Sequence, residues 1–142
     1  MKKITKSAEE TKKLAQEMAS QLKGGAVIAL TGELGSGKTT FVQGLAEFFG
    51  IAQEVSSPTY TLIQEYNIKD TRLPLTKLIH IDCYRLNNYQ ELLDVGINDY
   101  YEQPESMIII EWAEKAKPII PATAHWIKFQ HGKNDTERII EV

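Results

Sequence analysis

The 142-residue sequence predicts an α/β protein of three layers, in which helices cover a mixed parallel and antiparallel central sheet. Three observations predict it. A short apolar run at 26–31 leads directly into a glycine-rich loop, and a helical pattern follows that loop at 39–50. Two strand-turn-strand patterns occur at 59–86 and 125–142. Buried strands followed by helices favour parallel pairing and short turns favour antiparallel pairing, so both are expected in one sheet.

The composition is that of an ordinary globular protein, with 42% hydrophobic and 25% charged residues. We expect a single nucleotide-binding domain over residues 1–142, because this length suits one core. No apolar run approaches the ~20 residues that span a bilayer, and the polar N-terminus does not resemble a secretion signal. The single cysteine, Cys83, allows no intramolecular disulfide and is typical of a reducing compartment, so a cytoplasmic protein is expected. The net charge of -3 argues against a broad nucleic-acid surface.

The first expected element is a helix that begins at Ser7. Glu10 follows three residues later, which is the pattern of a capping box. Apolar residues then recur at helical spacing, and Gly24-Gly25 is expected to end the helix. The run AVIALT (26–31) is short, apolar and flanked by glycines, which is typical of a strand buried on both faces.

The elements that follow the glycine-rich loop are read from periodicity and turn residues. In the helix at 39–50, Phe41, Leu45 and Phe48 are expected to face inward, with Gly50 as the stop. The runs 59–68 and 75–86 predict an antiparallel hairpin around a polar turn. The remaining expectations are one or two short helices broken near Gly96, a strand at 107–111, a loop marked by Pro118 and Pro121, and a last hairpin with strands at 125–130 and 137–142.

The segment Gly32-Glu33-Leu34-Gly35-Ser36-Gly37-Lys38-Thr39 fits the phosphate-loop pattern G-x-x-x-x-G-K-[ST], and Thr40 continues it into the helix. It lies between a buried strand and a helix start, as phosphate binding requires. Glycines let backbone N–H groups turn inward around phosphate oxygens, and the helix adds the positive end of its dipole. Lys38 is expected to contact the β- and γ-phosphates and the Thr39 hydroxyl to ligate Mg²⁺. The fold class is therefore predicted to be P-loop NTPase-like.

A phosphate loop also needs a carboxylate at the tip of a neighbouring strand, to orient Mg²⁺ or the attacking water. Asp82 closes the apolar run LIHID and Glu111 closes MIIIE, so both are candidate catalytic residues together with Lys38. An acid that ends an apolar strand is also an ordinary solvent-exposed strand end. The two interpretations are left open for each.

Other conspicuous residues allow two interpretations as well. Ser57, Pro58, Thr59 and Tyr60 stand where P-loop proteins place a switch that senses the γ-phosphate, although Ser-Pro also starts plain turns. Trp112 is either core packing or a wall of the site. The three histidines and Cys83 are interpreted as core or surface residues, because no zinc or thiol-catalysis pattern surrounds them.

Five segments in order make the sequence more specific than a generic phosphate loop: GELGSGKTT (32–40), SPTYTL (57–62), HIDCYRL (80–86), ELLDVGINDYY (91–101) and IIEWAEK (109–115). Together they resemble the bacterial TsaE family, also called YjeE or YdiB, over nearly the whole chain. That family is the ATPase component of the machinery that makes N6-threonylcarbamoyladenosine at adenosine 37 of tRNAs reading codons that start with A.

The resemblance implies a P-loop α/β fold, binding of ATP/ADP with Mg²⁺, ATP hydrolysis, and partnership with the TsaD and TsaB proteins. Carried over to this sequence, it makes Thr39 and Glu111 the metal-side residues, Asp82 a catalytic or metal-linked carboxylate, and 57–60 a switch-like segment. It adds Thr11, at the start of the first helix, to the nucleotide-binding set. Whether the protein itself contacts tRNA is left open.

Other function classes fit less well. A GTPase-like switch lacks its guanine-reading N-K-x-D sequence, because Thr76-Lys77-Leu78-Ile79 has no acid where one is needed. A small-molecule kinase needs several lid arginines, and the chain has only Arg72, Arg85 and Arg138. A nucleotide-gated binding module that does not hydrolyse is disfavoured by Asp82 and Glu111. Arg85 is the one candidate arginine near the γ-phosphate, although a surface salt bridge is the other interpretation of it. Hydrolysis is therefore expected to be slow without partners.

Overall fold

The protein forms one seven-stranded sheet in the computed structural model, which describes residues 1–51, 55, 62–69 and 74–142. The strand order across the sheet is β1-β7-β6-β2-β5-β4-β3. The strand bounds are β1 Lys2–Thr5, β2 Val27–Gly32, β3 Ile63–Asn67, β4 Lys77–Asp82, β5 Ser106–Glu111, β6 His125–His131 and β7 Arg138–Glu141.

The four central strands, β6, β2, β5 and β4, run parallel to one another. At one edge β3 pairs antiparallel with β4, and at the other β7 and β1 add two further antiparallel pairings. The predicted mixed sheet is thus confirmed, as are both predicted hairpins.

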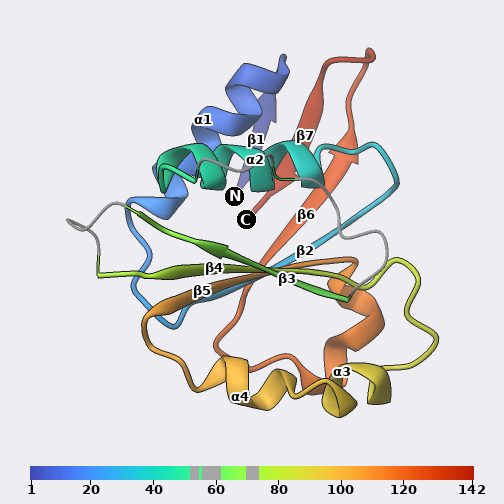
Figure 1. Ribbon diagram of the computed structural model, residues 1–142. Coiled ribbons are helices and arrows are strands. Elements are labelled where there is room, and N and C mark those ends of the chain that lie inside the picture. The colour runs from blue at the N-terminus through green and yellow to red at the C-terminus, as the bar shows by residue number, and fades with distance from the viewer. Residues whose placement is uncertain (52–54, 56–61, 70–73) are drawn as a thin grey trace.

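Helices cover both faces of the sheet (Figure 1). One face carries α1 (Ala8–Ala19) and α2 (Lys38–Phe48), which pack against each other. The other carries α3 (Gln90–Asp94), α4 (Ile97–Tyr101) and the 3-10 helix η1 (Ala113–Ile119). The predicted break at Gly96 is confirmed, since Gly96 has a left-handed φ of 85° between the two short helices.

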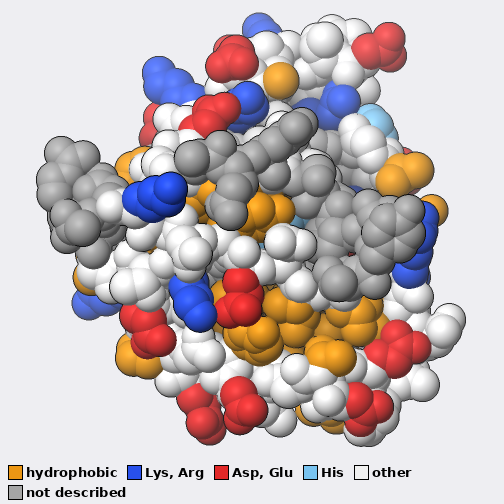
Figure 2. All heavy atoms as spheres, in the orientation of Figure 1, with side chains coloured by type: hydrophobic (Ala, Val, Ile, Leu, Met, Phe, Trp, Pro, Cys, Tyr) orange, Lys and Arg blue, Asp and Glu red, His pale blue; other side chains and the backbone are white. Residues whose placement is uncertain are grey.

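Strand residues alternate between the two cores because successive side chains point to opposite faces. In β2, Ile28 and Leu30 belong to the core under α1 and α2, whereas Val27 and Ala29 belong to the core above α3, α4 and η1. All four are almost completely buried, which explains why this strand reads as a continuous apolar run. Figure 2 shows apolar side chains on the surface between the open β3 edge and the layer of α3 and α4.

The N-terminal helix differs from its prediction at its end. Ser7 caps it as expected, accepting a hydrogen bond from the Glu10 backbone N–H at 3.1 Å, but the Glu10 carboxylate returns to Lys6 N–H rather than to Ser7. The helix ends at Ala19, not at Gly24-Gly25. Gly24 is needed for close packing instead, because a Cβ there would lie 2.2 Å from the Pro104 carbonyl oxygen.

Three further details were not predicted. Strand β1 was missed, because four mostly exposed residues carry little pattern of their own and the strand forms only by pairing with β7. Pro118 lies inside η1 rather than in a loop. Phe48 is only partly buried, and its neighbour Phe49 fills the core.

Within the residues that the structure describes, no helix is both long enough and apolar enough to cross a membrane.

Candidate nucleotide-binding site

A cavity of about 580 Å³ opens beside the start of α2, at the carboxyl ends of the parallel strands. Open α/β sheets bind ligands at this edge, because the loops that leave the strands diverge there. Its walls come from the start of α1, the glycine-rich loop, the strand ends, and the turn between β6 and β7: Ser7, Ala8, Thr11, Leu34, Gly35, Gly37, Lys38, Thr39, Thr40, Leu62, Asp82, Tyr84, Arg85, Glu111, Trp112, Asp135, Thr136 and Arg138.

The glycine-rich loop depends on glycine for two different reasons. Gly37, the N-cap of α2, has a φ of 107°, a conformation that other residues adopt only with strain. Gly32 combines a φ of 138° with crowding, because a Cβ there would lie 2.4 Å from the Phe129 carbonyl oxygen of the neighbouring strand. The first glycine therefore fits the loop against β6, and the last turns the chain into the helix.

Lys38 lies almost fully buried at the base of this loop. Its ammonium donates hydrogen bonds to the carbonyl oxygens of Gly32 and Glu33, the latter at 2.9 Å, and lies 4.1 Å from the centre of the Trp112 ring. Burial lowers the pKa of Lys38 from its ordinary value. The nearby acids act in the opposite direction, and Glu111 has the largest effect among them. Carbonyl oxygens of the glycine-rich loop thus hold the Lys38 ammonium beside the cavity.

Glu111 and Thr39 meet across 72 residues of sequence. Thr39, in the first turn of α2, donates its hydroxyl hydrogen to Glu111 Oε1 at 3.0 Å. The other carboxylate oxygen, Oε2, lies 2.5 Å from Nε2 of His80. Glu111 is 2% exposed, so it is not the solvent-exposed strand end that remained open as an interpretation.

Asp82 is the direct register partner of Glu111, because β4 and β5 are parallel and end together. Its Oδ1 accepts a hydrogen bond from the Tyr84 backbone N–H at 2.9 Å, which fixes the turn after β4. Asp82 is half-buried and lines the cavity. The two candidate acids therefore stand side by side on the face of the sheet that α2 covers.

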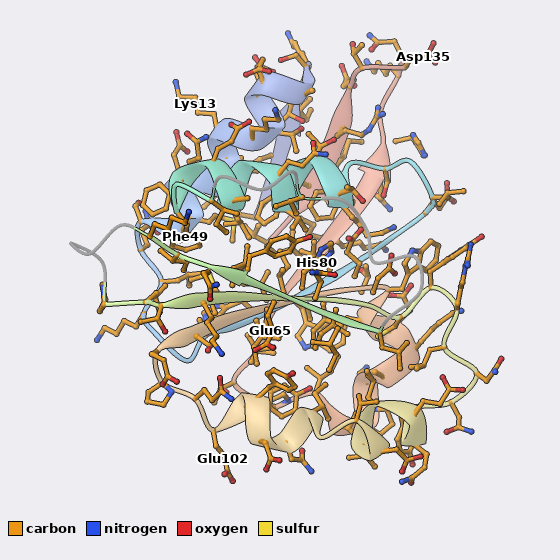
Figure 3. The ribbon with its side chains drawn as sticks, in the orientation of Figure 1. Lys13, Phe49, Glu65, His80, Glu102 and Asp135 are labelled. Atoms are coloured by element: carbon orange, nitrogen blue, oxygen red, sulfur yellow. The ribbon has the colours of Figure 1, made fainter. Side chains whose placement is uncertain are left out.

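The turn between β6 and β7 forms the far wall of the cavity. Figure 3 shows Asp135 at the tip of this hairpin and His80 near the middle of the sheet, on the α2 side. Arg138 donates hydrogen bonds to the Asp135 and Glu137 carbonyl oxygens at 2.7 and 2.9 Å. The Arg138 side chain also lies near the last glycine of the phosphate loop, 3.5 Å from where a Cβ of Gly37 would stand.

Most of the residues singled out from the sequence meet at this cavity, namely Thr11, Leu34, Gly35, Gly37, Lys38, Thr39, Thr40, Asp82 and Glu111. Thr11 is buried and its hydroxyl is hydrogen-bonded to that of Thr5 at 2.7 Å. Ser36, within the loop, is buried, and Glu33 borders a second hollow together with Trp126. The switch-like segment Ser57, Pro58, Thr59 and Tyr60 lies outside the described residues.

Sequence reasoning missed two residues of the site or its surroundings, His80 and Arg138, and left a third, Trp112, open between two interpretations. His80 was taken for an ordinary core or surface histidine; its signal was the spacing of two from Asp82, which puts both side chains on one face of a strand. Arg138 gave no local signal, and its position corrects the view that Arg85 is the one candidate arginine. Trp112 is a wall of the site, with a left-handed φ of 56° and a ring that contacts Lys38.

The side chains at Thr39, Asp82 and Glu111 fit a magnesium ion in chemical type, because Mg²⁺ prefers oxygen ligands and commonly takes only one or two carboxylates together with substrate phosphates. Within the described part of the chain, no group of three or more His, Cys, Asp or Glu residues could hold a metal by itself. A metal here would therefore depend on the phosphates for part of its ligand shell.

Comparisons with known proteins point in the same direction. A family model described as threonylcarbamoyl adenosine biosynthesis protein TsaE matches residues 5–140. A tRNA threonylcarbamoyladenosine biosynthesis protein TsaE from Bacillus subtilis is 38% identical over 135 residues, which cover 95% of this chain and 80% of the relative. A protein of the same name from Aquifex aeolicus is 42% identical over 117 residues, 81% of this chain and 78% of the relative.

A solved structure is similar over nearly the whole chain. The crystal structure of Bacillus subtilis YdiB is similar with a TM-score of 0.78 and 35% sequence identity, over 99% of this chain and 82% of that one. The likeness confirms the predicted P-loop-like α/β fold with its mixed sheet.

Proposed function

Because this chain belongs to the TsaE family and so to the biosynthesis of threonylcarbamoyladenosine in tRNA, we propose that it binds ATP with Mg²⁺ and hydrolyses it to ADP and phosphate in support of that pathway. The observation that carries the proposal is the convergence of Lys38, the Thr39–Glu111 pair and Asp82 on one cavity. These residues come from the helix start and from two strand ends, and their types are those that phosphoryl chemistry uses.

Each residue has a role that follows from its position. The backbone N–H groups of the glycine-rich loop and the start of α2 bind the phosphates. Lys38 exchanges its hydrogen bonds to the Gly32 and Glu33 carbonyl oxygens for bonds to phosphate oxygens, which restores the favourable surroundings that a buried ammonium needs.

Thr39 and Glu111 are the residues that would hold Mg²⁺, which when bound offsets negative charge on the phosphate oxygens. Asp82, one strand away from Glu111, would accept a hydrogen bond from the attacking water and so orient it. Thr11, Asp135, Thr136 and Arg138 lie around the same cavity, where they are available to contact the rest of the nucleotide.

ATP is proposed as the nucleotide rather than GTP, since the chain lacks the guanine-reading sequence. A direct competition between the two nucleotides in Mg²⁺ tests this. We expect ATP to bind more tightly, and a tenfold preference for GTP, about 1.4 kcal/mol in the opposite direction, would favour the GTPase-like switch instead.

We further propose that hydrolysis is slow in the isolated protein and increases with the TsaD and TsaB proteins. One guanidinium nitrogen of Arg138, Nη1, already donates hydrogen bonds to the Asp135 and Glu137 carbonyl oxygens of its own hairpin. Fewer of its donors are therefore left for a γ-phosphate. In other P-loop enzymes an arginine supplied by a partner or by rearrangement raises the rate by roughly 10³ to 10⁵.

The test is a steady-state phosphate-release assay at fixed salt, with and without the TsaD–TsaB complex, using Lys38→Ala as the background control. A clear rise over the slow basal rate supports the proposal. Equal rates, together with no co-elution on a sizing column in ATP, would remove the partnership and leave a stand-alone ATPase. No hydrolysis under either condition, despite tight ATP binding, would favour a nucleotide-gated binding module.

A further inference from the structure

We propose that His80 is a positioning residue for the metal side of this site: its Nε2–H holds Glu111 Oε2, so that Oε1 stays turned toward Thr39 and the place of the metal. The inference rests on the proposed function, because it assigns His80 a task that matters only if Mg²⁺ and nucleotide bind there. It places a histidine that touches neither nucleotide nor metal in the machinery of the site.

The sheet register creates the contact. His80 lies on β4 opposite Ile109, and Glu111 lies two residues further along β5 on the same face. The side chains therefore meet diagonally across two parallel strands, a distance that long side chains can bridge. Nε2 and Oε2 are 2.5 Å apart, and the histidine is completely buried.

The two oxygens of Glu111 have separate partners, and this division is what orients the group. We assign the hydrogen of this contact to Nε2, because a carboxylate that is to face a metal ion accepts hydrogen bonds rather than donating them. With Oε2 held at 2.5 Å by a ring that is itself packed in the core, Oε1 is left at 3.0 Å from the Thr39 hydroxyl. The carboxylate is then already oriented, so binding a metal costs it no further rotational freedom.

The other ring nitrogen supports this interpretation. Nδ1 of His80 is buried and has no hydrogen-bond partner among the described residues. A histidine kept only to fill the core carries this unpaired polar atom at a cost that an apolar side chain would avoid. The compensating contact that the structure displays is the one to Glu111.

The size of the effect can be bounded from metal sites in general. Loss of a hydrogen-bonding partner behind a metal ligand commonly costs about 10- to 100-fold in metal affinity or activity. The phosphate loop does not contact His80 through any described hydrogen bond, so nucleotide binding without metal should be nearly unaffected.

Two amide variants at position 80 separate the length of the side chain from its polarity. His80→Gln places an amide N–H near the former Nε2 position, whereas His80→Asn carries the same amide but is too short. Leu78→Val is the matched control, because Leu78 is fully buried on the same face of the same strand, one pleat away. The readout is the dissociation constant of β,γ-imido ATP in EDTA divided by that in Mg²⁺, measured by calorimetry on the full chain. We call this ratio the magnesium factor.

In His80→Asn we expect this magnesium factor to fall about 10- to 100-fold, while the affinity in EDTA stays unchanged. In His80→Gln and Leu78→Val the factor should fall by less than about 10-fold. An unaltered factor in His80→Asn, or equal losses in the two amide variants, would overturn the proposal. A wild-type protein that shows no magnesium factor would instead contradict the proposed function itself.

A measurement on the unmodified protein covers the case in which the variants do not fold. In a long-range ¹H–¹⁵N spectrum, His80 Nε2 should carry a hydrogen both in the free protein and with Mg²⁺ and β,γ-imido ATP bound. Loss of that hydrogen on binding would show that the contact does not serve the bound state, and the proposal would fail.

Discussion

The two faces of the same strand ends have opposite chemistry. On β4, His80 and Asp82 point to the α1–α2 face, whereas Ile79 and Ile81 point to the face covered by α3, α4 and η1, with Cys83 continuing that side. The first face contains a connected chain of polar contacts from His80 through Glu111 to Thr39. The second is an apolar core.

The difference shows how a sheet with an apolar core on both faces can separate binding from stability at the ends of its central strands. The apolar face gains free energy from burial alone, at about 25 cal/mol per Å². On the polar face a buried acid such as Glu111 needs hydrogen-bonding partners, and His80 and Thr39 are two of them. Changes to the two faces should therefore affect different measurements.

The largest expected effect is on the apolar face. Ile79→Ala should lower the free energy of unfolding by about 2 to 5 kcal/mol, because Ile79 is fully buried and its loss leaves a cavity. Urea denaturation measures this. The folded variant should still bind ATP with wild-type affinity, and a weakened affinity at low denaturant would show that the two faces are not separable.

Lys38→Ala should have the reverse pattern. Loss of a charged phosphate ligand is expected to reduce ATP hydrolysis by roughly 10²- to 10³-fold. The free energy of unfolding should be unchanged or slightly higher, since burial lowers the pKa of Lys38 and thus disfavours its charged form in the fold. Phosphate release and urea denaturation on one preparation test both parts; wild-type hydrolysis would remove Lys38 from the site.

Glu111→Gln and Asp82→Asn should lower hydrolysis about 10- to 100-fold and affect nucleotide binding less, because these acids act on metal and water rather than on the phosphate cradle. Single-turnover rates and calorimetric affinities separate the two. If both variants turn over ATP normally, the acids are structural.

The smallest predicted effect concerns pH and belongs to the apolar face. Burial raises the pKa of Cys83 from 9.0 to about 12, so the folded state keeps its proton where the unfolded chain loses it. The resulting stability is fully present below pH 9 and is lost as the pH rises toward 12. Between pH 8 and 10 this thiol should account for about 1 kcal/mol of lost unfolding free energy.

Cys83→Ala is the comparison for that measurement. Its unfolding free energy in urea should fall less steeply with pH over the same range than that of the wild type. Parallel slopes in the two proteins would mean that Cys83 does not titrate differently on unfolding.

The sequence predicted the parts of this molecule whose chemistry is local. The phosphate loop is one continuous segment whose glycines and lysine have fixed spacing, so it could be identified without a fold. The central strands and both hairpins were also predictable, because their apolar runs and turns lie within short windows. Asp82 and Glu111 could be named as candidates because each ends such a run.

What escaped prediction depends on register and packing between distant segments. The His80–Glu111 contact joins residues 31 apart and exists only because β4 and β5 pair in one register. Arg138 reaches the cavity because the last hairpin folds beside the loop near Gly37. The end of α1 at Ala19 was missed because Gly24 was interpreted as a helix stop. Glycine is needed at position 24 because the Pro104 carbonyl oxygen leaves no room for a Cβ.

The central claim is that the polar face, and not the apolar one, is a site for ATP with Mg²⁺. The most direct test is a calorimetric titration of ATP with Mg²⁺ into the wild type, Lys38→Ala, and Ile79→Val as the matched change on the opposite face. The account predicts equal affinity for the wild type and Ile79→Val and a loss of at least about 10²-fold for Lys38→Ala. Tight binding that survives in Lys38→Ala would contradict it.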